Sequence, residues 1–136
     1  AKQIALIENG FQKNIYVGNL NSMRTIADVR DAVNAYYLLV TKKPKFGENY
    51  NIGGKFSCTV GDILKYLIKI SHLKSVKIIK DKERMRPIDA DLQIPDVSKF
   101  KKHTGWKPKI KFEQTMLDLL NYWRDRVSSF GPDINR

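Results

Sequence analysis

The chain of 136 residues contains a single cysteine, Cys58, so no disulfide can form within it. No histidine lies near Cys58 in the sequence to activate its thiol, and we interpret it as a small buried residue. The two histidines, His72 and His103, stand far apart and outside any cluster with the spacing of metal ligands. These shortages argue against thiol, disulfide and metal chemistry.

Long apolar runs are also lacking, and no charged-then-apolar secretory segment opens the chain, which begins with Ala1. A soluble, cytoplasmic location without membrane contact is the default expectation. No Gly-x-Gly-x-x-Gly follows a predicted strand, so the fingerprint of a dinucleotide site is absent from the sequence. The length suits one small domain.

Positive charge is abundant, with 25 Lys and Arg against 14 Asp and Glu and a net charge of +11. It could attract nucleic acid, attract a small anion, or form a solvated surface. The lysines are dispersed along the chain, which favours the solvated surface. A nucleic-acid-binding module is an alternative, but RNA-binding signatures and zinc spacing are missing, and Tyr36 and Trp123 fall on apolar helix faces typical of a core. A pure interaction domain is a third possibility.

Periodicity and turn signals predict a mixed α/β order with short strands and amphipathic helices, too few strands for a complete doubly wound sheet. The predicted elements are a helix at 1–9, a strand at 15–17, an extended piece at 21–27, a helix at 28–41, a strand at 50–52, a helix from Thr59 to Ile68, a strand at 76–79, a helix at 97–103 between Asp96 and Gly105, a helix at 112–127 and a tail at 128–136. Domain 1–127 therefore precedes a frayed tail.

Two of these helices have clear start signals. Asp28 is a good N-cap, with Asp31 in the first turn, and Thr59 caps the helix with the cleanest amphipathic pattern. The apolar residues that repeat at helical spacing are Val29, Val33, Tyr36, Tyr37 and Val40 in the first helix, and Val60, Ile63, Leu64, Leu67 and Ile68 in the second.

The stretch from Arg84 to Asp96 carries the strongest indication of binding chemistry. Pro87 fixes its own φ and drives Arg86 toward an extended conformation, which holds a guanidinium on a defined loop. A planar, permanently charged fork suits a phosphate, and Asp89 could accept a hydrogen bond from a sugar hydroxyl. An ordinary surface loop with a chance Arg-Pro pair is the competing interpretation.

Three stretches in this order resemble the C-terminal, nucleotide-sugar-binding part of extended short-chain dehydrogenase/reductases, and most closely the GDP-mannose 4,6-dehydratase family and its sister reductases. The stretches are Val17-Gly18-Asn19-Leu20-Asn21-Ser22-Met23-Arg24 with Asp28-Val29-Arg30-Asp31-Ala32-Val33, then Tyr50-Asn51-Ile52-Gly53-Gly54, then Arg84-Met85-Arg86-Pro87-Ile88-Asp89 with Asp96, Lys99, Gly105, Trp106 and Pro108. The resemblance covers about residues 1–127, and the ordered set is specific although each piece alone is weak.

The resemblance implies roles for three charged residues. Arg24 matches an arginine that contacts the substrate diphosphate, and Arg86 matches one that contacts the diphosphate and ribose. Asp89 stands where the family has an acid that accepts from the ribose hydroxyls. For each arginine, a surface ion pair with a nearby acid is the alternative.

Tyr16 and Val17 match the strand that lies beside the nucleotide base, and Asn19, which ends this strand, joins the expected substrate-binding set. One departure from the family lies at Arg24-Thr25-Ile26, where many relatives carry Arg-Asp-Trp or Arg-Asp-Phe. The arginine is kept and its acidic neighbour is lost, which puts in doubt a helper role for position 25.

The family's nicotinamide site and its Tyr-x-x-x-Lys pair belong to an N-terminal Rossmann region that this sequence does not match. The resemblance implies an NADP-dependent lyase as the parent, in which a hydride leaves C4 of mannose, water is lost across C5 and C6, and the hydride returns at C6. The fragment should bind the GDP-sugar, contribute no catalytic residue and be inactive alone. The sister reductase, or an epimerase or dehydratase for another nucleotide sugar, is the alternative, and the parent is expected to form a homo-oligomer.

Part of this chain is expected to pack on the missing Rossmann sheet. Apolar surface would then be exposed on the Asp28–Thr41 helix or the strand at Tyr50. We therefore predict a marginally stable or self-associating fragment.

Overall fold

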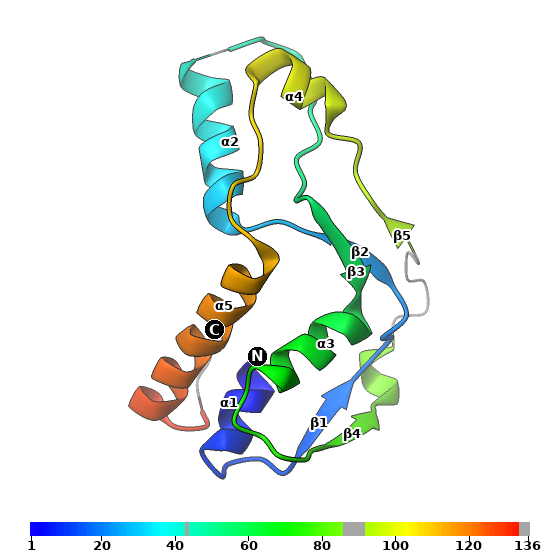
Figure 1. The fold of residues 1–136 in the computed structure, drawn as a ribbon, viewed down its shortest axis with the longest axis vertical. Coiled ribbons are helices and arrows are strands. Elements are labelled where there is room, and N and C mark those ends of the chain that lie inside the picture. The colour runs from blue at the N-terminus through cyan, green and yellow to red at the C-terminus, as the bar shows by residue number, and fades with distance from the viewer. Residues whose placement is uncertain (43, 86–91, 134–136) are drawn as a thin grey trace.

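The computed structural model describes residues 1–42, 44–85 and 92–133 and is a mixed α/β fold (Figure 1). Its elements are α1 (Lys2–Glu8), β1 (Asn14–Val17), β2 (Met23–Ile26), α2 (Val29–Thr41), β3 (Phe56–Thr59), α3 (Val60–Lys69), β4 (Lys77–Lys80), the 3-10 helix η1 (Lys82–Arg84), β5 (Leu92–Gln93), α4 (Ser98–Thr104) and α5 (Phe112–Phe130). Helices and short strands are thus mixed along the chain, as the periodicity predicts.

The strands form two small sheets. β1 and β4 pair in parallel, with Ile15 opposite Ile78. In the other sheet β2 is central, antiparallel to β3 and parallel to β5. Figure 1 shows α1, α3, β1 and β4 at one end of the molecule, α2 and α4 at the other, and the sheet of β2 between them.

The larger hydrophobic core lies where α1, α3, α5 and β1 meet. Its fully buried members are Ile4, Ile15, Leu67, Met116 and Leu120. Helix α3 begins with a capping box, in which Thr59 and Asp62 each bond the other's backbone N–H, as expected from Thr59 as cap. Its predicted apolar residues Ile63, Leu64 and Ile68 pack against the core. This end of the molecule therefore encloses its own apolar surface.

A smaller cluster forms at the other end from Ala35, Phe100 and Trp106. Tyr50 joins it, with its ring 5.5 Å from that of Phe100. The chain enters this cluster through Gly105, which ends α4 in the left-handed conformation at a φ of 71°, where a side chain would be strained. The cluster lies on one side of α2.

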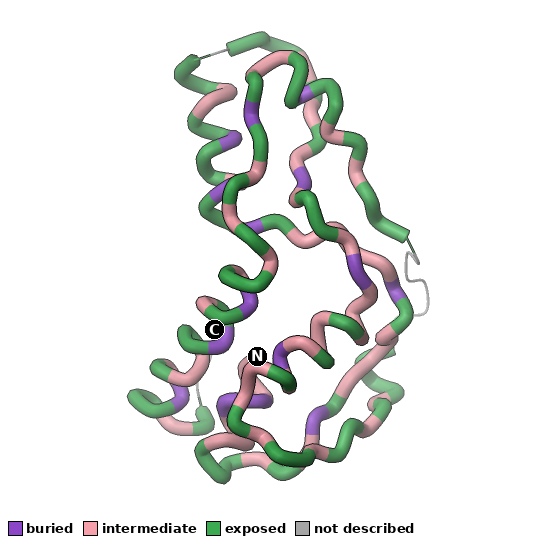
Figure 2. Tube along the Cα trace, in the orientation of Figure 1, coloured by how far each residue is buried: buried purple, intermediate pink, exposed green. Residues whose placement is uncertain are grey.

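The opposite side of α2 remains uncovered, and Figure 2 shows much of this helix as exposed. The exposed apolar side chains are Val29, Val33, Tyr36, Tyr37 and Val40, at 56–73% of their full exposure. The expectation of exposed apolar surface on this helix is confirmed, whereas the assignment of Tyr36 to the core is wrong. Trp123, the other aromatic assigned to a core, does pack against the buried pair Ala5 and Val127.

The predicted strand at Tyr50–Ile52 is wrong for the structure described, in which residues 48–54 form neither helix nor strand. A strand needs a hydrogen-bonded neighbour, and this segment packs by side chains instead, through Tyr50. Gly54 then approaches the end of β2 so closely that a Cβ would lie 1.6 Å from the carbonyl oxygen of Ile26. The strand before α3 is β3, a few residues later.

Other boundaries shift slightly. Helix α4 starts at Ser98, whose N–H donates to Asp96 at 2.8 Å, one residue beyond the predicted start. Helix α5 continues to Phe130 and takes in the first residues of the predicted tail. Within the described residues, every helix is too short or too polar to cross a lipid bilayer.

Candidate nucleotide-sugar site

Arg24 lies on β2, the central strand of its sheet. Across the sheet it is opposite Cys58 on β3 and Gln93 on β5, so a row of three side chains shares one face. One guanidinium nitrogen, Nη1, donates to the carbonyl oxygen of Met23 at 2.9 Å. Cys58 is 5% exposed, and burial raises the pKa of its thiol, which confirms it as a small buried residue.

A pocket of about 500 Å³ opens beside this row. The described residues that line it are Arg24, Thr25, Asn51, Leu92, Gln93, Ile94 and Pro95. Arg24 is the one charged residue among these lining residues. The described lining thus combines one guanidinium with neutral polar and apolar residues, and such side chains can contact a phosphate and the hydroxylated group attached to it.

Thr25 occupies the position at which many relatives have an acid. Its hydroxyl bonds that of Ser57 on the neighbouring strand at 2.8 Å. The side chain is thereby used to join β2 to β3.

A second pocket, of about 340 Å³, lies along β1 and α3 and is mainly apolar. Val17 and Gly18 line it together with Leu20, Val60 and Leu64. The structure thus places Val17 in a cavity, where a flat apolar ring could pack. Tyr16 and Asn19 are not among its described lining residues.

Tyr16 is 38% exposed on β1, and its backbone is held by Gln3 of α1. The Gln3 amide accepts from the Tyr16 N–H at 2.8 Å and donates to its carbonyl at 2.9 Å, as a neighbouring strand would. Asn19 stabilises the turn after β1 by donating to the Ser22 hydroxyl at 2.8 Å. Of the three uncharged site residues expected, Val17 lines the apolar pocket, and the binding roles of all three stay predictions.

The ends of the Arg84–Asp96 stretch are fixed at separate points of the fold. The carbonyl oxygen of Arg84 lies so close to Gly18 that a Cβ there would approach it to 2.4 Å. At the far end, Leu92 and Gln93 pair with Met23 and Arg24. The predicted ligands Arg86 and Asp89 lie outside the described residues.

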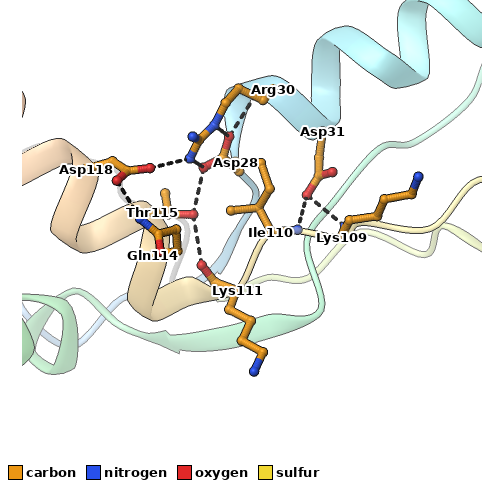
Figure 3. Close-up of polar contacts among 9 residues, drawn as sticks. All are labelled: Asp28, Arg30, Asp31, Lys109, Ile110, Lys111, Gln114, Thr115 and Asp118. Atoms are coloured by element: carbon orange, nitrogen blue, oxygen red, sulfur yellow. Dashed lines mark hydrogen bonds and ion pairs between the residues drawn. The ribbon is translucent and has the colours of Figure 1, made fainter.

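The end of β2 is anchored by a buried carboxylate, Asp28, which is 6% exposed (Figure 3). It caps α2 by accepting from the Arg30 N–H, as predicted, and also accepts from the Arg30 guanidinium at 2.8–2.9 Å. Thr115 of α5 donates to it at 2.8 Å. These donors, the Arg30 guanidinium first, lower the pKa of Asp28 well below its usual range although burial opposes them.

The same network joins α2 to the C-terminal helix and its preceding loop. Arg30 also donates to Asp118 at 2.6 Å, and Asp31 accepts from the backbone N–H groups of Lys109 and Ile110 at 3.0 and 2.9 Å. Figure 3 shows Asp28 and Asp31 directed from the start of α2 toward Thr115 and toward Lys109 and Ile110, respectively. The strand that carries Arg24 is therefore held to two other segments directly after it ends.

Sequence reasoning missed two polar residues of the Arg24 pocket, Asn51 and Gln93. Asn51 falls in the segment predicted to be a strand, and Gln93 in the stretch that follows Asp89. Gln93 has no sequence signal of its own, and the motif that contains Asn51 does not indicate this pocket. Both positions follow from the pairing of β5 with β2 and from the path of residues 48–54.

Comparison with known proteins places this fold. The profile of the family described as GDP-mannose 4,6 dehydratase matches residues 1–119. GDP-6-deoxy-D-mannose reductase from Pseudomonas aeruginosa is 29% identical over 128 residues, 93% of this chain and 41% of the reductase. GDP-mannose 4,6 dehydratase 1 from Arabidopsis thaliana is 28% identical over 116 residues, 83% of this chain and 31% of that enzyme. This chain thus spans well under half the length of these relatives.

Solved structures agree. RMD from Pseudomonas aeruginosa, determined with NADPH, superposes with a TM-score of 0.82 at 27% identity, covering 93% of this chain and 41% of that one. UDP-glucuronic acid 4-epimerase from Bacillus cereus, determined with UDP-glucuronic acid and NAD, gives 0.78 at 24% identity over 92% and 39%, a likeness of fold.

The fold is accordingly that of the C-terminal part of an extended short-chain dehydrogenase/reductase. Within that class, the chain belongs to the GDP-mannose 4,6 dehydratase family, as the sequence resemblance indicates.

Proposed function

We propose that this chain is the nucleotide-sugar-binding part of an enzyme that acts on a GDP-sugar, with GDP-mannose as the substrate and its 4,6-dehydration as the reaction. The observation that carries this proposal is the Arg24 pocket, whose described lining residues combine one arginine with neutral polar groups. In this assignment Arg24 contacts the diphosphate, and the apolar pocket beside Val17 takes the base.

The chemical step belongs to a region outside this chain. A nicotinamide cofactor, NADP, would accept and return the hydride, and the N-terminal region of the parent would hold it. The sequence of this chain contains no Gly-x-Gly-x-x-Gly and no Tyr-x-x-x-Lys. Its own residues therefore bind and orient the nucleotide sugar, and the chain alone is inactive.

The exposed face of α2 supports the expected partner. Five large apolar side chains lie uncovered on this face. On the opposite side of α2, residues 48–54 pair with no strand in the described chain. In relatives, the remaining and larger share of the protein lies before the matched part. We assign the α2 face to contact with that cofactor-binding region.

A GDP-sugar reductase is a second candidate, favoured by the 29% identity to GDP-6-deoxy-D-mannose reductase over 93% of this chain. Net consumption of NADPH, measured in the full-length enzyme that contains this chain, distinguishes the two reactions. A dehydratase returns its hydride to the sugar and causes no net loss of NADPH absorbance. A reductase consumes one NADPH for each 4-keto sugar reduced.

Titration calorimetry with GDP-mannose tests the binding role. Arg24→Gln should weaken binding about tenfold or more, because a charge-assisted contact to the diphosphate is lost. Arg126→Gln is the matched control, since Arg126 stacks on Tyr122 and Phe130 of α5 and lines no part of the Arg24 pocket. Equal affinity of Arg24→Gln and the unmodified chain would refute the assignment, and turnover of GDP-mannose by the chain with NADP alone would refute its inactivity.

A further inference from the structure

Gln93 differs from the other polar residues of the Arg24 pocket in how its side chain is used. Arg24 donates to the carbonyl of Met23, and Thr25 bonds Ser57. Asn51 donates from its amide to the carbonyl oxygen of Asp96 at 3.3 Å. Among the described residues, the side chain of Gln93 makes no hydrogen bond or ion pair.

The position of Gln93 is fixed although its side chain is exposed. It lies on β5 in register with Arg24 on β2, and residues in register on neighbouring strands share a face of the sheet. Its side chain therefore lies on the same face of the sheet as that of Arg24, which is assigned to the diphosphate, and both residues line the same pocket.

We propose that Gln93 is a second binding residue of this pocket and recognises a sugar hydroxyl of the ligand that Arg24 holds by its phosphates; this inference rests on the proposed function. A carboxamide both donates and accepts, which matches a hydroxyl, whereas a phosphate oxygen at neutral pH only accepts. The hydroxyl belongs either to the ribose or to the hexose, both of which are attached to the diphosphate in a nucleotide sugar.

Titration of the chain with GDP-mannose, GDP and inorganic pyrophosphate tests the inference in a Gln93→Leu variant. Loss of the amide should weaken binding of GDP-mannose about fivefold. An equal loss for GDP assigns the hydroxyl to the ribose, and unchanged GDP binding assigns it to the hexose. Unchanged GDP-mannose binding, or an equal loss for pyrophosphate, would overturn the inference.

Gln114→Leu on α5 is the control for the loss of one carboxamide, because Gln114 is exposed and bonds only Asp118 among the described residues. Failure of the unmodified chain to bind any of the three ligands would count against the proposed function itself, and the inference would fall with it. Binding that depends on Arg24 but not on Gln93 would reject the inference alone.

Discussion

Helices α2 and α3 begin in the same way but differ in whether their apolar faces are covered. Each follows a strand, and each is capped by a side chain predicted from the sequence, Asp28 for α2 and Thr59 for α3. Helix α3 then packs its apolar face against the main core. Helix α2 instead buries Ala35 and the carboxylate of Asp31, and leaves its apolar face uncovered.

The difference shows that an amphipathic pattern predicts a helix and a face, but not whether this chain covers that face. At the end of the molecule that holds the main core, helices α1 and α5 from the two ends of the sequence help to cover the apolar face of α3. The other end rests on the small cluster of Ala35, Phe100 and Trp106 and on polar contacts from Asp28 and Asp31. Stability should therefore depend on α3 through packing and on α2 through hydrogen bonds.

The largest expected effect comes from shortening Leu67 of α3, which is 4% exposed in the main core. Leu67→Ala should lower the free energy of unfolding by about 2–5 kcal/mol, from lost burial and the cavity left behind. Urea denaturation followed by circular dichroism measures it. Val33→Ala on α2 is the contrasting variant, and because Val33 is 58% exposed it should change stability by less than about 0.5 kcal/mol. Similar losses for the two variants would contradict the comparison.

A smaller effect is expected at the start of α2. Asp28→Asn keeps a good N-cap residue but removes the charge that faces Arg30 and Thr115. The free energy of unfolding at neutral pH should fall by about 2 kcal/mol, the scale of hydrogen bonds to a charged group. Ser98→Ala, at the exposed start of α4, offers a control in which no buried charge is altered, and an equal loss there would contradict the assignment.

The same carboxylate predicts a pH dependence. The pKa of Asp28 is lowered in the folded chain from its ordinary value of 3.8, so the unfolded chain takes up this proton first on acidification. Its stabilising contribution is complete above about pH 5 and decreases as the pH falls below that value. Melting temperatures measured from neutral to acidic pH should decline less steeply for Asp28→Asn. An unchanged slope would show that other carboxylates, such as Glu8 paired with Arg124, account for the acid sensitivity.

The starts and the apolar faces of helices α2 and α3 could be predicted from the sequence, because helix caps and hydrophobic periodicity are local features. Asp28, Thr59 and Gly105 act at the helix ends where their residue types predict. The strand expected at Tyr50 was not found, since strand formation depends on a neighbour that the described chain does not supply at that place. A helix can thus be predicted from a short segment of sequence, whereas a strand depends on the segment that lies beside it in the fold.

The residues of the candidate binding site also divide into those that local sequence motifs indicate and those that depend on how distant segments pair. Arg24 and Val17 could be selected from motifs, and the structure places both in walls of pockets. Gln93 lies in no motif that indicates binding, and the motif that contains Asn51 does not indicate this pocket. Both residues reach the Arg24 pocket only through the parallel pairing of β5 with β2 and the path of residues 48–54. Arg86 and Asp89 stay predictions.

The exposed face of α2 gives the smallest change in stability and the sharpest test of the comparison. Val33→Lys with Tyr37→Lys should alter unfolding by less than about 0.5 kcal/mol, because both side chains are more than half exposed. It should weaken self-association of the chain about tenfold in sedimentation experiments, since two charges would have to be buried in the contact. Leu117→Lys with Tyr122→Lys adds the same charge to α5, where these residues are 40% and 52% exposed, and should leave association unchanged. A chain that stays monomeric at all concentrations, or equal effects of the two pairs, would mean that the uncovered face of α2 is not what brings copies together.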